Sequence, residues 1–212
     1  MNKLYICNIK DLYDEGLYKQ AYSKLSTSRR DKVDSLRSYN DKCLSITSEL
    51  LVNKLTNNSN IIYNEYGKPY VYDNSVYFNV SHSNEYVICA TSNNEVGCDI
   101  EHVRDVNMNV AKRYFNEKEY LDIINSNNKI DAFFKYWVLK ESFIKNIGFG
   151  LKQSLDSFCI DLNNLSIKQD VNKNNYYLHL YELDDYKYAI CLFNDEDVEI
   201  KHIDIKCLTS AK

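Results

Sequence analysis

The chain has 212 residues, of which 44% are hydrophobic and 26% charged, and its net charge is −4. These proportions are typical of a soluble globular protein, and the acidic balance argues against a broad nucleic-acid-binding surface. No apolar run approaches the ~20 residues of a membrane helix, and the seven cysteines show no CxxC spacing. We therefore expect a cytoplasmic protein with reduced thiols, without a membrane segment, a disulfide framework or a structural zinc site.

The first part of the chain predicts a strand, a helical region and a small antiparallel sheet. Lys3–Ile9 has a strand pattern, and helical patterns follow up to Leu25 and from about Arg29 to Leu55. Within the second of these, Ser38–Leu55 is the stronger helix, and Asp41 is its expected N-cap. Further short strands are expected at Ile61–Tyr63, Val76–Val80, Tyr86–Thr91 and Val96–Ile100.

The second part predicts helices followed again by strands. The expected helices are Val106–Tyr114, Glu117–Ser126 and Lys129–Ile147, the last ended by Gly148. The expected strands are Ser157–Ile160, Tyr176–Tyr181 and Tyr188–Phe193. The overall prediction is an α+β fold.

A weak internal similarity suggests that the chain contains two related halves. The segment Tyr86–Ala90 resembles Tyr188–Leu192, which lies 102 positions later, and the preceding strands at Tyr77 and Tyr177 are 100 positions apart. A duplication would divide the chain into an N-terminal half, 1–103, and a C-terminal half, 104–212, packed tightly with the site between them.

Glu141 interrupts an apolar helical pattern. The apolar residues recur at spacings of three and four, namely Ile130, Phe133, Phe134, Trp137, Val138, Ile144 and Ile147. Position 141 falls inside this stripe, and a buried carboxylate must neutralise, pair with a cation or bind a metal. Lys145, at i+4, is the expected neighbour on the same side of the helix.

Asp99 and Glu101 form a second acidic feature. They are two residues apart at the end of a predicted strand, so their side chains point to the same face. A solvated strand end is one interpretation. A site for a hard cation such as Mg²⁺ is the other, with Glu141 as a third acid.

Several further residues could contact a phosphate. His82, between Ser81 and Ser83, is interpreted as a hydrogen-bond donor to phosphate rather than as part of a hydrolase pair, because no GxSxG elbow occurs. The Arg29, Arg30 and Lys32 cluster could be only a solvated helix face, whereas Lys68 lies on a rigid Gly-Lys-Pro turn. No Walker A or GxGxxG motif is present.

Together these segments resemble the 4′-phosphopantetheinyl transferases of the surfactin-synthetase-activating (Sfp) type. The matching stretches are Tyr66–Pro69, Phe78–Ser83, Val96–Glu101, Arg113–Phe115 with Glu119, and Trp137–Lys145. The most specific feature is Gly-x-Asp-x-Glu followed about 40 residues later by Trp-x-x-Lys-Glu-Ser. The clear similarity covers roughly residues 66–158, and the chain length is that of the two-half members.

The resemblance implies a pseudo-twofold α+β fold of two similar halves, each a small antiparallel sheet packed with helices, with coenzyme A bound between them. It implies that Asp99, Glu101 and Glu141 bind Mg²⁺. The implied coenzyme A contacts are Arg29, Lys32, Lys68, Ser81, His82 and Lys145.

The resemblance also implies the reaction, in which phosphopantetheine passes from coenzyme A to a serine of an apo acyl or peptidyl carrier protein and 3′,5′-ADP is released. The implied catalytic residues are Glu141, Lys145 and His82, in a monomeric enzyme that binds neither nucleic acid nor membrane. One departure is Leu44, with Lys42 nearby, where many members carry an arginine.

Two alternatives stay open on the sequence alone. The chain could be a non-catalytic module that binds coenzyme A or a carrier protein, or it could be a metal-dependent phosphodiesterase that uses water as nucleophile. The complete acidic trio argues against the non-catalytic module.

Overall fold

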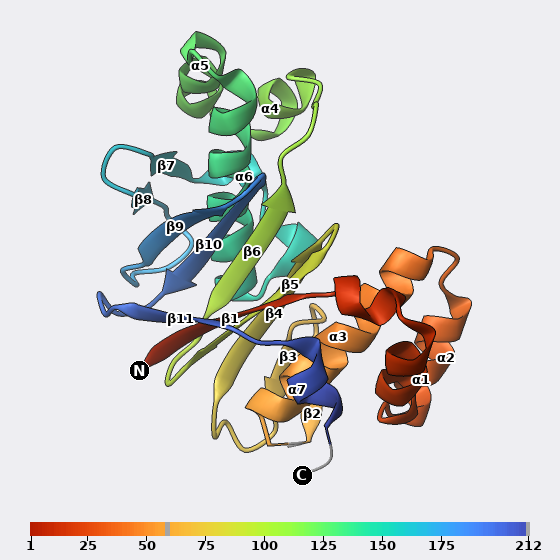
Figure 1. Cartoon of the computed structure of the whole chain (residues 1–212). Coiled ribbons are helices and arrows are strands. Elements are labelled where there is room, and N and C mark those ends of the chain that lie inside the picture. The colour runs from red at the N-terminus through yellow and green to blue at the C-terminus, as the bar shows by residue number, and fades with distance from the viewer. Residues whose placement is uncertain (58–59, 211–212) are drawn as a thin grey trace.

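A computed structural model describes residues 1–57 and 60–210 and shows one succession of elements twice (Figure 1). Each succession has a strand, short helices, one long helix, a small hairpin and two antiparallel strands. The first comprises β1 (Asn2–Asn8), α1 (Glu15–Ser23), α2 (Thr27–Ser35), α3 (Tyr39–Leu55), β2 (Ile61–Tyr63), β3 (Pro69–Val71), β4 (Tyr77–Ser83) and β5 (Tyr86–Ser92). The second comprises β6 (Gly97–His102), α4 (Asn109–Tyr114), α5 (Glu117–Asn125), α6 (Lys129–Ile147), β7 (Cys159–Asp161), β8 (Ser166–Lys168), β9 (Tyr177–Leu183) and β10 (Tyr186–Leu192).

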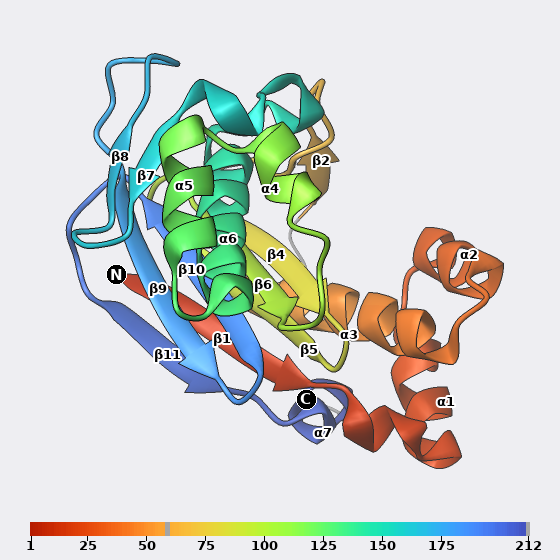
Figure 2. The same ribbon diagram turned by 90° about the horizontal axis from the view of Figure 1, so that it is seen from above.

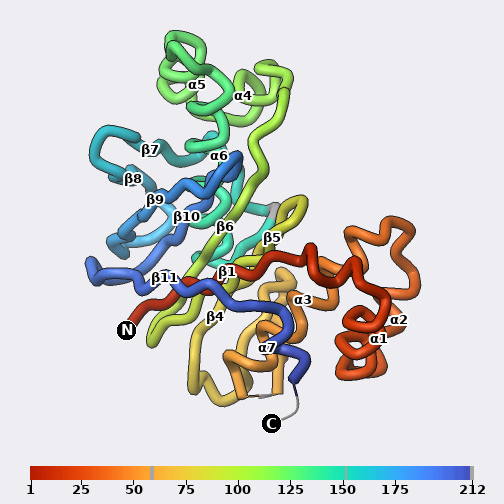
Figure 3. Tube along the Cα trace, viewed as in Figure 1, coloured from red at the N-terminus to blue at the C-terminus, as the bar shows by residue number. Residues whose placement is uncertain are grey.

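The strands build two larger sheets, with helices packed against each. One has the order β11-β1-β5-β4 and the other β6-β10-β9, and the hairpins β2-β3 and β7-β8 stand apart. The last strand, β11 (Val198–His202), returns to pair in parallel with β1, and the two run side by side in Figure 3. The short final helix α7 (Ile205–Thr209) then packs on α1 and α3. These features confirm the expected α+β class.

Apolar side chains fill three layers between these elements. Helix α6 covers β6 and β10, whereas α3 covers β4 and β5 (Figure 2). A third cluster lies between the two sheets and is made by β1, β5, β6 and β10, with Leu4, Ile88, Ile100 and Ile190 fully buried. The alternation of such residues along each strand therefore serves two cores, one on each face of the sheet. Within the described ranges, 1–57 and 60–210, no helix is long and apolar enough to cross a membrane.

The two hairpins that follow the long helices are equivalent at a constant offset. Ser83 pairs with Tyr86 across the first turn and Leu183 with Tyr186 across the second, and Asn84 and Asp184 both adopt φ 48°. The offset is therefore 100 for both strands, and the offset of 102 expected for the second strand was wrong by two residues. An error of two preserves the faces of a strand, which is why the sequence similarity still seemed to match.

The equivalent tyrosines of these hairpins meet. The rings of Tyr86 and Tyr186 pack edge to face with centroids 4.9 Å apart, and the Tyr186 hydroxyl accepts a hydrogen bond from the Asn84 amide at 3.0 Å. Strand β6 pairs with β10, although it precedes the expected boundary between residues 103 and 104. The division at that boundary stays a prediction.

Side chains, not backbone bonds, join β4 to β6. Asn79 Oδ1 accepts from the Cys98 amide at 2.9 Å, Ser81 Oγ donates to Asp99 at 2.8 Å, and Ser83 Oγ donates to Glu101 at 3.0 Å. Ser81 and Ser83 are two residues apart on β4 and thus reach Asp99 and Glu101, which are two residues apart on β6, as the period of two in a strand allows. This seam fixes the two acids of β6 against the serines of β4.

Gly97 allows α6 to approach β6 closely. A Cβ atom at this position would lie 2.0 Å from the Ser142 carbonyl oxygen and 2.3 Å from the Asn146 amide nitrogen. The first glycine of Gly-x-Asp-x-Glu is therefore required by the helix that carries Glu141. This close approach of α6 to β6 places Asp99 and Glu101 near Glu141.

Helix ends are set by local signals, and some were predicted wrongly. Helix α6 has the expected bounds and ends at Gly148, whose φ is 71°. The N-cap of α3 is Ser38, which accepts from the Asp41 amide at 3.3 Å, so the prediction of Asp41 as the cap was wrong. The elements β3, β8, β11 and α7 had no predicted counterpart.

Candidate active site

A cavity of about 1250 Å³ opens between α2, α3, β4, β6 and α6. It brings together residues that are far apart in the sequence, and eight of the nine predicted site residues line it. They are Arg29, Lys32, Ser81, His82, Asp99, Glu101, Glu141 and Lys145. Its walls come from α2, α3 and β4 of the first succession of elements and from β6 and α6 of the second.

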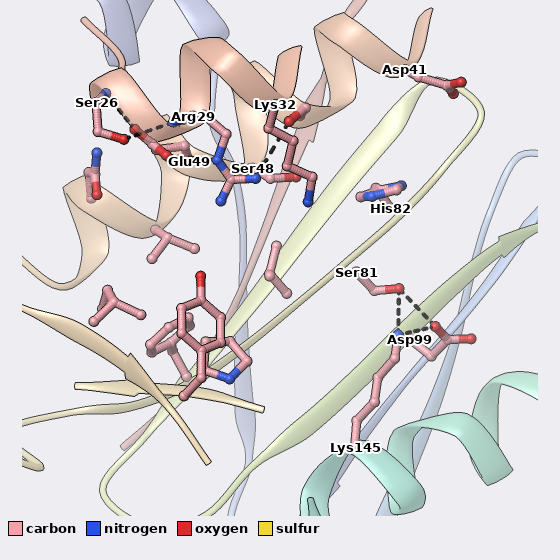
Figure 4. A pocket seen from close by; sticks show the side chains of 18 of the residues that line it. Ser26, Arg29, Lys32, Asp41, Ser48, Glu49, Ser81, His82, Asp99 and Lys145 are labelled. Atoms are coloured by element: carbon pink, nitrogen blue, oxygen red, sulfur yellow. Dashed lines mark hydrogen bonds and ion pairs between the residues drawn. The ribbon is translucent and has the colours of Figure 1, made fainter. Parts of the chain in front are cut away.

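Asp99 is at the centre of the acidic wall. Its side chain is buried, and Oδ1 accepts a hydrogen bond from Ser81 Oγ at 2.8 Å and an ion-pair contact from Lys145 Nζ at 2.6 Å. Lys145 Nζ also donates to Ser81 Oγ at 2.9 Å, so the three side chains form a triangle (Figure 4). Burial alone would lower the pKa of Lys145, but Asp99 raises it above its ordinary value. Lys145 is therefore charged at neutral pH.

The second oxygen of Asp99 has no partner among the described residues. Asp99 Oδ2 is buried and accepts no hydrogen bond. Because an unsatisfied buried acceptor is costly, this oxygen is open to a water molecule, a cation or a ligand donor.

Glu101 has a matching environment one step further along β6. Glu101 Oε2 accepts from Ser83 Oγ at 3.0 Å and pairs with Arg104 Nη1 at 3.0 Å. Asp99 and Glu101 thus each have their own serine on β4 and their own cation. The sequence motif Ser-His-Ser held this signal, since its serines share the two-residue spacing of the acids.

Glu141 is half-buried rather than part of the apolar core. Most of α6 is buried all round, but the row Trp137, Glu141 and Lys145 lines the cavity at i, i+4 and i+8. Lys145 lies on the same side of the helix, as expected, but in the described chain it pairs with Asp99 and not with Glu141. Burial, and then the charges of Asp99 and Glu101, raise the pKa of Glu141 above its ordinary value, although Lys145 lowers it.

Basic side chains lie on the opposite wall, on α2. Figure 4 shows Arg29 and Lys32 pointing from this helix into the cavity, with His82 between Lys32 and the triangle around Asp99. Burial by the cavity walls, together with Lys145 and Lys32, lowers the pKa of His82. The imidazole is therefore mainly neutral at pH 7 in the ligand-free chain.

Glu49 on α3, which the sequence did not suggest, holds Arg29 in place. Its carboxylate pairs with Arg29 Nε at 2.7 Å and accepts from the Ser26 amide at 2.9 Å, so it joins the start of α2 to α3. Leu44 is buried in the core and does not line the cavity, where Ser45 and Ser48 are the nearest α3 residues with hydroxyls.

Lys68 lies apart from the other cations. Its ammonium donates to Glu95 and to the Asn146 carbonyl at 2.7 Å, and its side chain lines a second cavity of about 690 Å³. This cavity adjoins the first at Trp137, Glu141 and Lys145. Lys68 thus ties the Gly-Lys-Pro turn to the end of α6, and its role as a coenzyme A contact stays a prediction.

A fully buried ion pair includes Lys140, which lies next to Glu141 in the sequence of α6. Lys140 Nζ lies 2.8 Å from Glu119 Oε2, and both side chains have no exposed surface. Lys140 also donates to the carbonyls of Leu155 and Phe158, while Glu119 accepts from the Ile160 amide. The lysine of Trp-x-x-Lys-Glu-Ser therefore has a structural environment, which sequence reasoning did not anticipate.

The acids suit a hard cation, although no group of three metal-binding side chains converges in residues 1–57 and 60–210. Asp99, Glu101 and Glu141 are oxygen donors, which Mg²⁺ prefers, and the unpartnered Asp99 Oδ2 marks a free ligand atom. Burial is the main cause of the raised pKa of Glu141, and the charges of Asp99 and Glu101 add a repulsion that a cation among these acids would relieve.

Comparison with known proteins identifies the family. The chain is 34% identical to 4′-phosphopantetheinyl transferase gsp of Aneurinibacillus migulanus over 173 residues, which are 77% of this chain and 73% of that protein. Residues 95–192 also match the family described as the 4′-phosphopantetheinyl transferase superfamily. The chain belongs to this superfamily.

Other members of the superfamily align over a shorter range. The chain is 40% identical to 4′-phosphopantetheinyl transferase Sfp of Bacillus subtilis over 134 residues, 60% of each protein. The crystal structure of Thermotoga maritima holo-[acyl-carrier-protein] synthase aligns with 46% of this chain, at 23% identity and a TM-score of 0.40. The match with residues 95–192 contains both Gly97–Glu101 and Trp137–Lys145, so the resemblance stated from these motifs is confirmed.

Proposed function

We propose that the protein transfers 4′-phosphopantetheine from coenzyme A to a serine of an apo acyl or peptidyl carrier protein and releases 3′,5′-ADP. The observation that carries the proposal is that, in a member of this superfamily, one cavity holds cations on α2 and three carboxylates on β6 and α6. Coenzyme A carries a phosphate on the 3′ oxygen and a pyrophosphate on the 5′ oxygen of its ribose. Two such separated groups suit the separated cations of this cavity. The carriers in question serve nonribosomal peptide, polyketide or fatty acid synthesis.

The cations divide into two groups under this proposal. Arg29 and Lys32 would contact the 3′-phosphate, and His82, Ser81 and Lys145 would contact the pyrophosphate near the acids. Lys68 would approach the ligand from the second cavity. Glu49 supports this assignment because it holds Arg29 through Nε at 2.7 Å, while Arg29 Nη1 makes only a long contact with Ser45 Oγ at 3.5 Å.

Asp99, Glu101 and Glu141 would hold Mg²⁺. When bound, the ion neutralises pyrophosphate charge, which is the main requirement of phosphoryl-type transfer. The unpartnered Asp99 Oδ2 and the shared cavity support this ligand set.

The chain's own residues would carry out the proton transfer. The carrier serine Oγ forms a bond to the phosphorus that bears pantetheine, the bond from that phosphorus to the bridging oxygen breaks, and 3′,5′-ADP leaves. Glu141 takes the serine proton, directly or through water. Lys145 neutralises phosphate charge, and His82 orients a phosphate by donating a hydrogen bond. The site would act in a cytoplasmic monomer, whose two halves supply both walls.

Release of 3′,5′-ADP tests the proposal against its alternatives. Coenzyme A and Mg²⁺ are incubated with the protein, with and without an apo carrier protein, and 3′,5′-ADP is quantified by chromatography. Transfer predicts release only when the carrier is present. Release without carrier would favour a phosphodiesterase, and no release with any apo carrier would favour a binding module.

The assignment of the α2 cations predicts a specific kinetic effect. Arg29→Ala or Lys32→Ala should raise the KM for coenzyme A roughly tenfold and lower kcat far less, because their contacts are remote from the reacting phosphorus. Lys145→Ala should mainly lower kcat. Steady-state kinetics with varied coenzyme A measures both constants, and Arg30→Ala, on the same helix but outside the cavity lining, is the control. Small and equal effects for all three cavity residues would show that the assignment is wrong.

A further inference from the structure

Each acid of β6 is paired with a cation of the chain itself. Lys145 Nζ lies 2.6 Å from Asp99 Oδ1, and Arg104 Nη1 lies 3.0 Å from Glu101 Oε2. The Asp99 carboxylate is 6% exposed and the Lys145 side chain 28%, so this pair is largely shielded from water. Arg104 is 58% exposed, so its pair with Glu101 is screened and weak.

Lys145 and Arg104 pair with the same carboxylates, Asp99 and Glu101, that are proposed to bind Mg²⁺. Asp99 Oδ1 already accepts from both Ser81 and Lys145, which leaves only the buried Oδ2 of this residue without a partner. A divalent cation beside Asp99 would lie close to the Lys145 ammonium, and two positive charges at such short range repel each other strongly.

We infer that Lys145 is a built-in counter-ion of Asp99 that a divalent cation must displace, so that metal binding releases the lysine ammonium toward the substrate phosphate. The inference rests on the proposed function in taking Asp99, Glu101 and Glu141 as the metal-binding acids. It assigns Lys145 two positions, on Asp99 without the metal and on the phosphate with it. Arg104 is the counter-ion of Glu101 in the same way, but this pair is weaker because it is more exposed.

The geometry allows this movement. The Lys145 side chain ends at the cavity, and its row neighbours Trp137 and Glu141 also line the cavity. Ser81 can stay on Asp99 Oδ1 when the lysine leaves, because its hydroxyl is a separate donor to that oxygen. Displacement therefore costs Asp99 one partner and frees a cation where the pyrophosphate would lie.

Direct binding of Mn²⁺ to the protein alone tests the inference. Free Mn²⁺ is measured by electron paramagnetic resonance without coenzyme A or carrier, for the wild type, Lys145→Met and Arg104→Gln. We expect Lys145→Met to bind Mn²⁺ roughly tenfold tighter and Arg104→Gln only about threefold tighter, because a nearby positive charge has been removed. Lys135→Met is the matched control, since Lys135 is on the same helix but pairs with Asp131 and Glu182 away from the cavity. Its affinity should stay within about twofold of the wild type.

A thermal measurement accompanies the binding data. Without metal, Lys145→Met leaves Asp99 without its cation and should melt below the wild type, and Mn²⁺ should then raise its melting temperature more than that of the wild type. Lys145→Gln serves if the Met variant does not fold.

Equal or weaker Mn²⁺ binding by the Lys145 variants would overturn the inference, as would the absence of binding by all four proteins. The transfer assay separates this inference from the proposed function. Wild-type protein that modifies no carrier, combined with tighter Mn²⁺ binding by Lys145→Met, would remove the proposed function and leave the counter-ion role standing. If the wild type transfers normally and the variants have unchanged metal affinity, the proposed function stands and the counter-ion role of Lys145 is wrong.

Discussion

Glu141→Gln should lower Mg²⁺-dependent transfer by about 10²–10⁴-fold while leaving the protein folded. The amide can neither accept the serine proton nor supply the charge of the third acid. Transfer is measured at saturating coenzyme A and Mg²⁺, so that a loss of affinity for either does not hide the loss of turnover. Asp131→Asn, an acid of the same helix that faces Lys135 and Lys187, is the control and should retain its activity.

The raised pKa of Glu141 determines whether Glu141→Gln raises or lowers the stability of the metal-free protein. A carboxyl whose pKa is higher in the folded chain favours folding when it is protonated, and this contribution is lost as pH rises through its folded pKa. Without divalent metal, Glu141→Gln should therefore melt at or above the wild-type temperature at neutral pH, and the difference should shrink as pH falls. A large loss of stability with transfer retained by the folded fraction would show that Glu141 is a structural acid.

Lys140→Met should destabilise the protein by about 3–5 kcal/mol, because it leaves Glu119 charged and buried without its partner. It also leaves the carbonyls of Leu155 and Phe158 without a donor. Burial already raises the pKa of Glu119 and lowers that of Lys140, so either charge is unfavourable without its partner. Urea unfolding measures the free energy of unfolding.

Two further variants make this prediction specific. The double variant Lys140→Met/Glu119→Gln should recover part of the loss, since it removes both charges together. Lys135→Met breaks the more exposed pair with Asp131 and should cost at most about 1 kcal/mol. If Lys140→Met unfolds at the wild-type urea concentration, the buried pair does not support the fold.

Local signals in the sequence were sufficient for the elements that carry the site. Helix α6 has a long apolar period, an N-cap at Asn128 and a left-handed Gly148, so its bounds agree with the prediction. The acids Asp99 and Glu101 lie on one strand face because alternation is a property of any strand. These features depend only on neighbours in sequence.

Partners across the fold could not be predicted in the same way. The spacing of α6 places Lys145 beside Glu141, yet the lysine pairs with Asp99 because Gly97 brings β6 within contact of the helix. Glu49 holds Arg29, and Glu119 holds Lys140, through contacts 20 and 21 positions apart in the chain. Strand β11 is recognised only by its pairing with β1 from the other end of the molecule.

The intact mass of an apo carrier protein tests the central claim most directly. The carrier is incubated with the protein, coenzyme A and Mg²⁺, beside a carrier whose acceptor serine is replaced by alanine. We expect that the first carrier gains the mass of one phosphopantetheine and that the second gains none. Carrier proteins from peptide, polyketide and fatty acid synthesis that all keep their apo mass, with folded protein present, would contradict it.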